Sequence, residues 1–204
     1  MDLITIVLFI VAFSNLLLAY LFFSAKNNRT ASYFSLAVFG VAMWNLSMAF
    51  FRLSSGLALY FWAKSLYLAA IIIVGGFLLF SYSFSRKKMS FLKRKKVWWF
   101  FLLPIFIILA IFRKGVFVLS IATDKTLVFS NFYIVYIILI LSYFFIAFYG
   151  LAKIYKKKNS VVRHQLNYVF LGGGLSAFIG IIADLILPWF GYFGLFWLGP
   201  VSTI

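Results

Sequence analysis

Apolar residues form long blocks along the whole chain, and short polar segments separate them. The blocks cover about residues 3–24, 31–51, 57–84, 97–112, 132–152 and 166–187, and a last one begins near residue 195. A helix of about 20 apolar residues crosses a bilayer core and satisfies its own backbone groups there. The pattern therefore predicts an all-α membrane protein, with one domain over residues 1–204. We expect a bundle of six full transmembrane helices and the start of a seventh at 195–204.

Two segments change this picture locally. Residues 113–130 contain two apolar runs, Val116–Ile121 and Thr126–Phe129, on either side of Thr123–Lys125, and this arrangement predicts a small β-hairpin on the outer surface. Pro104 is expected to kink the short fourth span, which a packed membrane helix tolerates. The first block lacks a basic lead-in and a small-residue cleavage site, so we interpret it as a retained span rather than a signal peptide.

The composition excludes several classes of protein. Hydrophobic residues make up 66% of the chain, whereas a soluble globular domain is nearer half apolar. With no cysteine, one histidine and three acidic residues, the chain lacks the ligands of a usual metal centre, and we expect no cofactor. The same shortage of acids and bases argues against an enzyme.

The basic residues predict which side of the membrane each loop faces. The formal net charge is +16, which in a soluble protein would suggest nucleic-acid binding. Here, fourteen of the nineteen Lys and Arg residues lie in Lys26–Arg29, Arg86–Lys96 and Lys153–Arg163, which are alternate connections between spans. Cations near span ends are retained on the inner side, so nucleic acid is not expected as a partner. The N-terminus is then outside, and the protein is a multi-pass protein of the cell inner (plasma) membrane.

The most basic connection, Arg86–Lys96, carries seven cations and no acid. It would attract anionic lipid with about 1 kcal/mol per cation near the surface. Membrane topology alone is the simpler explanation for the same residues.

Asp184 is the sharpest candidate for a functional residue. It lies in an apolar span about one turn before Pro188, and ionisable groups in spans usually face the bundle interior. It would serve as a ligand or proton site. Alternatively, it forms an ion pair at the outer interface or is exposed to solvent; the candidate cations are Arg52, Lys64 and Arg113.

Several other side chains in the outer half have two interpretations each. Lys64 either snorkels to the headgroups or lines a pocket together with Trp62 and Tyr67. Trp44 and Asn45 either pack between helices or line a pocket. The full set of candidate ligand-binding residues is Trp44, Asn45, Arg52, Trp62, Lys64, Tyr67 and Asp184. The outer aromatic residues favour a small apolar or amphiphilic ligand, although interfacial belts have the same composition.

Small residues recur every four positions in the sixth span, at Gly172, Ser176 and Gly180. Such a face permits close helix approach. It predicts close packing inside the bundle, with a homodimer contact or a sliding surface as the alternatives. Gly75 and Gly76 in the third span also suggest close packing.

Short motifs at both ends of the chain resemble the N-terminal seven-helix sensor region of bacterial histidine kinases. In that family an apolar first helix runs into a short basic loop, and the second helix carries a tryptophan near its outer half. The motifs that carry the resemblance are Asn15–Ala19, Lys26–Arg29, Tyr33–Leu36, Trp44–Leu46, Phe132–Tyr136, Arg163–Gln165, Leu187–Pro188 and Leu198–Pro200.

The resemblance implies a sensory input module that couples an external or membrane-borne stimulus to a cytoplasmic output. Such sensors generally work as dimers, and the same module also precedes cyclase or phosphatase domains. The chain contains no phospho-acceptor histidine region or ATP-binding domain, so kinase activity would belong to a further C-terminal domain. A small transporter and a lipid-handling membrane protein are the alternatives. Against the first, we see no internal three-plus-three repeat.

Overall fold

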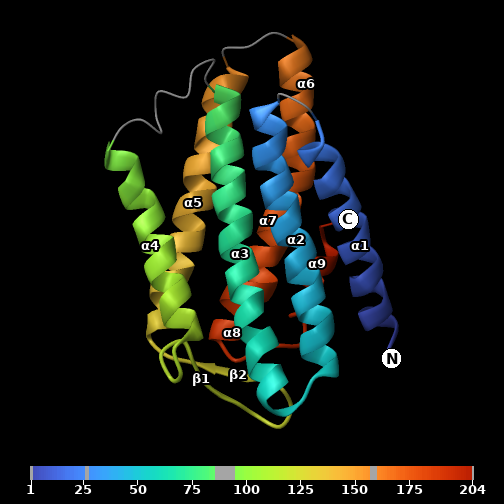
Figure 1. The fold of residues 1–204 in the computed structure, drawn as a ribbon, viewed down its shortest axis with the longest axis vertical. Helices are drawn as coiled ribbons and strands as arrows, with labels where there is room; N and C mark the ends of the chain where they lie inside the picture. The colour runs from blue at the N-terminus through green and yellow to red at the C-terminus, as the bar shows by residue number, and fades with distance from the viewer. Residues whose placement is uncertain (1, 26–27, 86–94, 157–159, 204) are drawn as a thin grey trace.

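A computed structural model describes residues 2–25, 28–85, 95–156 and 160–203 of the chain. Its main elements are long, roughly parallel helices with a two-stranded sheet at one end of the bundle (Figure 1). The long helices are α1 (Leu3–Phe23), α2 (Arg29–Leu53), α3 (Gly56–Ser85), α4 (Lys95–Phe112) and α5 (Phe132–Tyr155).

A sixth long segment contains two π-helical stretches. It consists of α6 (Ser160–Tyr168), η1 (Val169–Gly173), α7 (Gly174–Gly180), η2 (Ile181–Ile186) and α8 (Leu187–Trp189). The sequence pattern located this span and did not reveal its π-helical turns. A short helix, α9 (Leu198–Val201), follows after a reversal of the chain.

Five of the described helices are long and apolar enough to cross a membrane. They are Leu3–Phe23, Arg29–Leu53, Gly56–Ser83, Phe132–Tyr155 and Arg163–Trp189. In the fourth predicted span, α4 contains Pro104, and its described apolar part, Leu102–Phe112, is shorter than the others. The structure therefore supports a multi-pass helical membrane protein.

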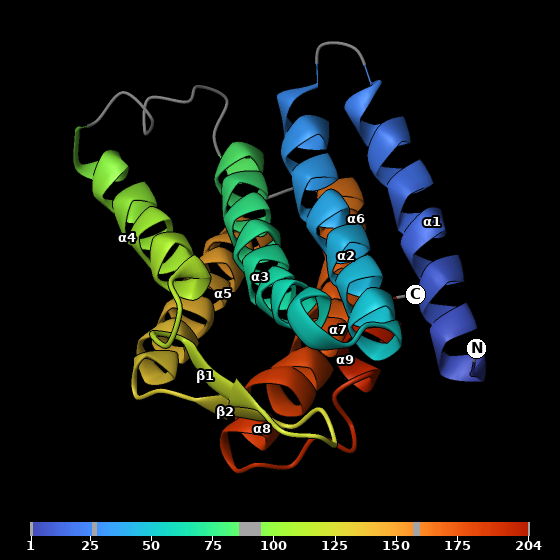
Figure 2. The same ribbon diagram turned by 60° about the horizontal axis from the view of Figure 1, so that its bottom comes forward.

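The helices form two layers. Figure 2 shows α1, α2, α3 and α4 side by side in sequence order, with α5 and the α6–α8 segment behind them. The closest contacts join α1 to α2, α2 to α3, and α3 to α5. At the α2–α3 contact, a Cβ added to Gly76 would lie 2.6 Å from the Ala37 backbone nitrogen. The expected close packing is therefore found at Gly76, whereas a Cβ on Gly75 would meet nothing within 4 Å.

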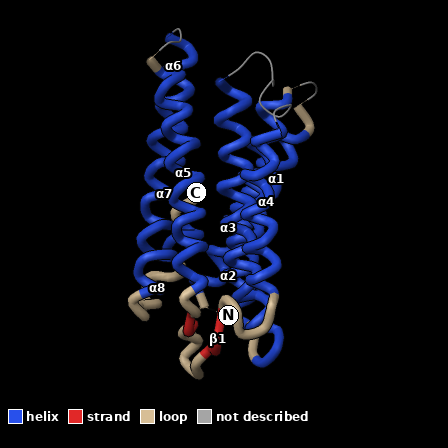
Figure 3. The backbone as a smooth tube through the Cα atoms, turned by 90° about the vertical axis from the view of Figure 1, so that its left-hand side faces the viewer, coloured by secondary structure: helices blue, strands red, loops and turns tan. Residues whose placement is uncertain are grey.

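The predicted hairpin is present at one end of the bundle. β1 (Val118–Ile121) and β2 (Leu127–Phe129) pair antiparallel, with a register irregularity between Val118 and Ser120. Figure 3 shows both strands at the end where the N-terminus lies. Lys125 at the turn holds the hairpin on the bundle, because its Nζ donates to the Arg52 carbonyl 2.5 Å away.

The chain reverses direction sharply after α8. Gly191 has a φ of +79°, which favours glycine, and the Tyr192 N–H donates to the Leu187 carbonyl at 3.0 Å. Residues 192–197 then lead back to α9, which contacts α1, α2 and α7. This return places α9 against the face of the bundle that holds the candidate site.

The Arg86–Lys96 connection lies outside the described residues, except for the first turn of α4. The expected anionic-lipid contact there stays a prediction.

Candidate functional site

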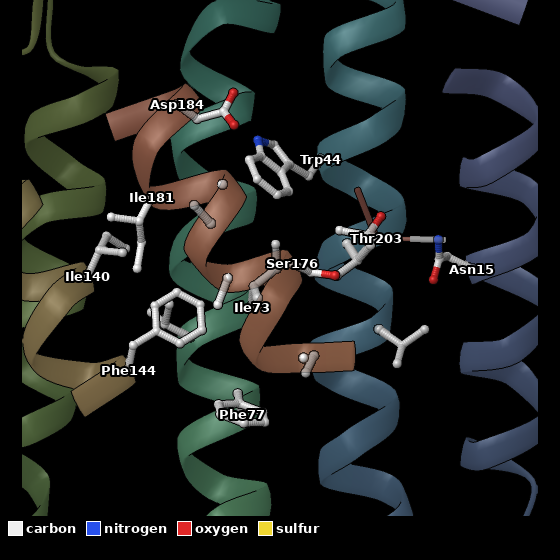
Figure 4. Close-up of a pocket in the computed structure, with 18 of the residues that line it drawn as sticks. Asn15, Trp44, Ile73, Phe77, Ile140, Phe144, Ser176, Ile181, Asp184 and Thr203 are labelled. Carbon is white, nitrogen blue, oxygen red and sulfur yellow. The ribbon is translucent and has the colours of Figure 1, made fainter. Parts of the chain in front are cut away.

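A cavity of about 410 Å³ lies inside the bundle, between the two layers of helices. Its wall is mainly apolar. Figure 4 shows Ile73 and Phe77 of α3, Ile140 and Phe144 of α5, and Ile181 of η2 around it. A cavity of this size and character is typical of small-molecule sites.

Asp184 lies at one end of this cavity, and Phe77 lies at the other (Figure 4). The Asp184 side chain is only 6% exposed, and neither carboxyl oxygen has a hydrogen-bond partner among the described residues. Its carboxyl group points toward the indole of Trp44 in the close-up. A buried polar group without a partner costs free energy, and such groups are rare in folded proteins.

The local backbone explains how Asp184 reaches this place. It lies in η2, whose π-helical turns interrupt the usual ladder of backbone bonds. The Tyr133 hydroxyl donates to the backbone carbonyls of Asp184 and Leu185, at 3.1 and 3.3 Å. Tyr133 therefore anchors the turn that carries the carboxyl group.

Gly199 of α9 closes one side of the carboxyl group. A Cβ on Gly199 would lie 1.5 Å from Asp184 Oδ2 and 3.2 Å from Trp44 Cη2. Only a residue without a side chain fits at this position. The backbone of α9 thereby packs against the carboxyl group and helps to bury it.

Most of the other polar groups near the cavity are engaged locally, although the buried Tyr67 hydroxyl and Asn45 Oδ1 have no hydrogen-bond partner among the described residues. Asn15 Nδ2 donates to the Val11 carbonyl at 3.0 Å, and the Ser176 hydroxyl donates to the Ser202 carbonyl at 2.7 Å. Asn45 Nδ2 donates to the Val41 carbonyl at 3.0 Å and contacts the Thr203 hydroxyl at 3.4 Å. Asp184 is therefore the acidic group of the cavity, set in an apolar wall.

The expected ion pair between Asp184 and an outer cation is not formed among the described residues. Arg52 pairs instead with Asp2, and Lys64 Nζ donates to the Phe112 carbonyl at 3.1 Å. Arg113 is exposed in the segment after α4. Exposure of Asp184 to solvent is also excluded by its burial. Within the described ranges, no group of three His or acidic side chains could hold a metal ion.

A second hollow, of about 470 Å³, lies at the end of the bundle near the N-terminus and the hairpin. Charged side chains line it, namely Asp2, Arg52, Asp124 and Lys125. Phe196 lines both hollows and is 6% exposed. It therefore separates the charged outer hollow from the apolar cavity.

Comparison with known proteins places this arrangement in a family. The family model for the N-terminal seven-transmembrane region of histidine kinases matches residues 7–201. The chain belongs to this family. No curated protein and no solved structure matches it.

Three of the candidate ligand-binding residues of this seven-transmembrane region line the cavity: Trp44, Tyr67 and Asp184. Arg52 lines the outer hollow instead. Trp62 lies outside the cavity wall and stacks on Phe50, with ring centroids 4.5 Å apart. Asn45 and Lys64 likewise make the local hydrogen bonds described above and do not line the cavity.

The small-residue face of the sixth span is split between two roles. A Cβ on Gly180 would lie 3.0 Å from Trp44 Cη2, so this glycine packs closely as expected. Gly172 does not pack closely, because a Cβ added to it would meet nothing within 4 Å. Gly172 is exposed and lines the cavity together with Gly173, so the cavity is open at this end.

Sequence reasoning missed Tyr133 and Gly199. Tyr133 was one aromatic residue among many in the fifth span, and Gly199 lies fifteen positions after Asp184, in a different helix. Both positions lie in motifs that carry the family resemblance, Phe132–Tyr136 and Leu198–Pro200. Nothing local in those motifs indicates the contacts of Tyr133 and Gly199, because each contact depends on how the helices pack.

Proposed function

We propose that this chain is the sensory input module of a histidine-kinase-type signalling protein. It would couple an external or membrane-borne stimulus to a cytoplasmic output. The observation that carries this proposal is the mainly apolar cavity with Asp184 at its end, in a chain of the histidine-kinase seven-transmembrane family.

A sensor responds only when its ligand binds one arrangement of the helices better than another. A cavity between two helix layers offers such a coupling, because a ligand there contacts both layers at once. The wall combines α2 and α3 from one layer with α5 and η2 from the other. A change in their separation would pass along α5 and the sixth span to the opposite end of the bundle.

The proposed topology follows from the positions of the helix ends. The hairpin and the start of α1 lie at one end of the bundle, and α3 and α5 end at the other (Figure 1). The three basic connections join helix ends at this second end. The positive-inside rule makes this end cytoplasmic, which puts the N-terminus outside and the protein in the inner (plasma) membrane. The start of the seventh helix would then run inward.

Two other functions of multi-span proteins are less well supported. A transporter is expected to show broken helices in repeated halves around a midplane site. Among the described helices, α4 is continuous through Pro104, and the π-helical interruptions lie in the sixth span alone. A lipid-handling enzyme needs an acid and a base positioned on a substrate, and Asp184 has no such partner among the described residues.

The reading frame past codon 204 gives the first test. An in-frame kinase, cyclase or phosphatase domain supports the proposal. A stop codon directly after a completed seventh span contradicts it and favours a transporter or a lipid-handling protein.

Variants of the full reading frame give the second test. Gly172→Leu would place a large side chain in the open end of the cavity without a backbone clash. We expect it to reduce the change in output that the stimulus produces, while membrane insertion is retained. Gly75→Leu is the matched control, since a Cβ there also meets nothing and Gly75 does not line the cavity. Equal signalling by both variants would reject the cavity as the sensing element.

A further inference from the structure

The end of the cavity at Asp184 has the chemistry of a site for a positively charged head group. We infer that the cavity binds a lipophilic amine: a single alkyl chain along the apolar wall, with its ammonium group next to the Asp184 carboxyl group and over the Trp44 ring. This inference deepens the proposed function by naming the class of ligand. Only the role of this ligand as the stimulus rests on the proposed function, and the binding itself does not.

The first observation is the state of the Asp184 carboxyl group. It is buried at the end of the cavity, points toward Trp44 (Figure 4) and has no hydrogen-bond partner in the described parts of the chain. The basic side chains described near this end are directed elsewhere: Arg52 to Asp2, Lys64 to Phe112, and Lys125 to Arg52. An ion buried without a partner costs several kcal/mol. A cation supplied by a ligand would remove this cost, and an anion would increase it.

The second observation is the aromatic wall beside the carboxyl group. Trp44 lies next to Asp184 in the close-up. A Cβ added to Gly180 or to Gly199 would lie 3.0 or 3.2 Å from Trp44 Cη2, so both glycine backbones pack against this ring. Tyr67 lines the same cavity. A cation is attracted by the face of an indole ring, and in the close-up the nitrogen edge of Trp44 is the part turned toward Asp184. The ammonium group would therefore lie against the carboxyl group and over the ring face, away from that edge. The narrow space between the two glycines also keeps the indole in place.

The third observation is the shape and polarity of the rest of the cavity. From Asp184 to Phe77 the wall is made of aliphatic and aromatic side chains, which suit an alkyl chain. Of the polar groups along it, Asn15 and Ser176 already donate to backbone carbonyls, and the Tyr67 hydroxyl has no partner among the described residues. The open end at Gly172 and Gly173 gives an amphiphile in the bilayer a way in. One polar end and one apolar end therefore match an amphiphile with a single charged head.

A matched series of ligands tests the inference. The purified protein is placed in nanodiscs of zwitterionic lipid, and binding of dodecyltrimethylammonium, dodecylamine, dodecanol and dodecanoate is measured, with empty nanodiscs subtracted. We expect both cations to bind at least ten-fold more tightly than dodecanol, and dodecanoate to bind most weakly. Equal binding of the alcohol and the cations would show that the cavity accepts any alkyl chain whatever its head group, and this result would overturn the inference.

Two variants locate the site. Asp184→Asn should abolish the preference for the cations over dodecanol, while Asp124→Asn, which removes an exposed acid at the hairpin, should leave it unchanged. Trp44→Leu keeps the carboxyl group and should weaken dodecyltrimethylammonium more than dodecanol. It provides the test if Asp184→Asn does not fold. Retention of the full cation preference in either cavity variant would contradict the assignment.

Binding is measured here without any signalling readout. The inference can therefore fail while the chain still proves to be a sensor, and it can hold even if the reading frame encodes no signalling output.

Discussion

At the scale of single residues, small side chains decide where this bundle can pack closely. Gly76 brings the backbone of α3 against Ala37 of α2, and Gly199 brings α9 against Asp184. Gly75 and Gly172 have the same local sequence character, yet a Cβ on either would meet nothing within 4 Å. The rotation of each helix about its axis decides which of these glycines faces a neighbouring segment, and the residue types around them do not.

The Gly76 contact predicts a stability effect with a matched control. Gly76→Ala should destabilise the protein by about 1–3 kcal/mol, because the added methyl group meets backbone that has no room to move. Gly75→Ala should leave stability unchanged or raise it by about 0.5 kcal/mol, since alanine favours the helix. Thermal unfolding in the same nanodiscs measures both. Equal melting temperatures for the two variants would show that α2 and α3 are not in close contact.

The Asp2 carboxyl group predicts a pH effect at the N-terminus of α1. The Thr5 hydroxyl, and next the Arg52 guanidinium, lower the pKa of Asp2 from 3.8 to about 2. Because the folded pKa is below the ordinary value, any stability from ionised Asp2 is complete above about pH 4 and is lost as pH falls through about 2.

An NMR titration of the Asp2 carboxyl carbon checks this expectation. Thr5→Val should raise the pKa of Asp2 toward 3.8, because it removes the largest cause of the shift. A wild-type pKa near 3.8 would contradict the observed contacts.

At the scale of elements, the sixth span is the least regular helix and carries the most unusual residue. Its two π-helical stretches lie on either side of α7, and the second one, η2, contains Asp184. Freed carbonyls in such a helix need donors from neighbours, and the Tyr133 hydroxyl from α5 supplies one. The Tyr133 hydroxyl therefore ties η2 to α5 at the turn that carries Asp184.

Removal of that hydroxyl should loosen the site. Tyr133→Phe is expected to cost about 1–3 kcal/mol, because two buried carbonyls lose their donor. It should also speed amide hydrogen exchange in η2. Tyr20→Phe in α1 is the control, since Tyr20 is exposed and should leave both quantities unchanged. Protection of η2 equal to wild type in Tyr133→Phe would show that the hydroxyl does not hold the turn.

At the scale of the whole molecule, the sidedness of the bundle determines how a stimulus could reach the cavity. The charged hollow near the hairpin and the apolar cavity share Phe196 as a partition. An outward-facing hairpin would put the charged hollow in contact with the cell exterior. Gly172 is exposed within the apolar span Arg163–Trp189, so the open end of the cavity would face the bilayer.

Because the chain has no cysteine, single-cysteine labelling gives a direct test of sidedness. In intact cells, an impermeant maleimide should label Thr123→Cys at the hairpin and should not label Gln165→Cys until the membrane is opened. Both positions are exposed in the structure. The reverse labelling pattern would overturn the N-terminus-out topology.

The sequence by itself determined the helical membrane class, the approximate positions of five candidate membrane-spanning helices, the hairpin and the family. These features are local: the bilayer core selects runs of about 20 apolar residues, and a hairpin is set by two short strands and their turn. The motifs that pointed to the histidine-kinase family are short and lie within single spans or connections. Asp184 was identified for a similar reason, because an acid in an apolar run is recognisable without any partner.

Only the tertiary structure decided which candidate residues meet. It brought Trp44 and Tyr67 to Asp184 and left Trp62 and Lys64 elsewhere, although all five share the outer half of the predicted bundle. It also showed Asp184 without its expected cation, with Gly199 against it. The reason is that rotation of a helix about its axis changes every neighbour while hardly affecting its hydrophobicity. Packing between helices therefore determines the site, and no single span encodes it.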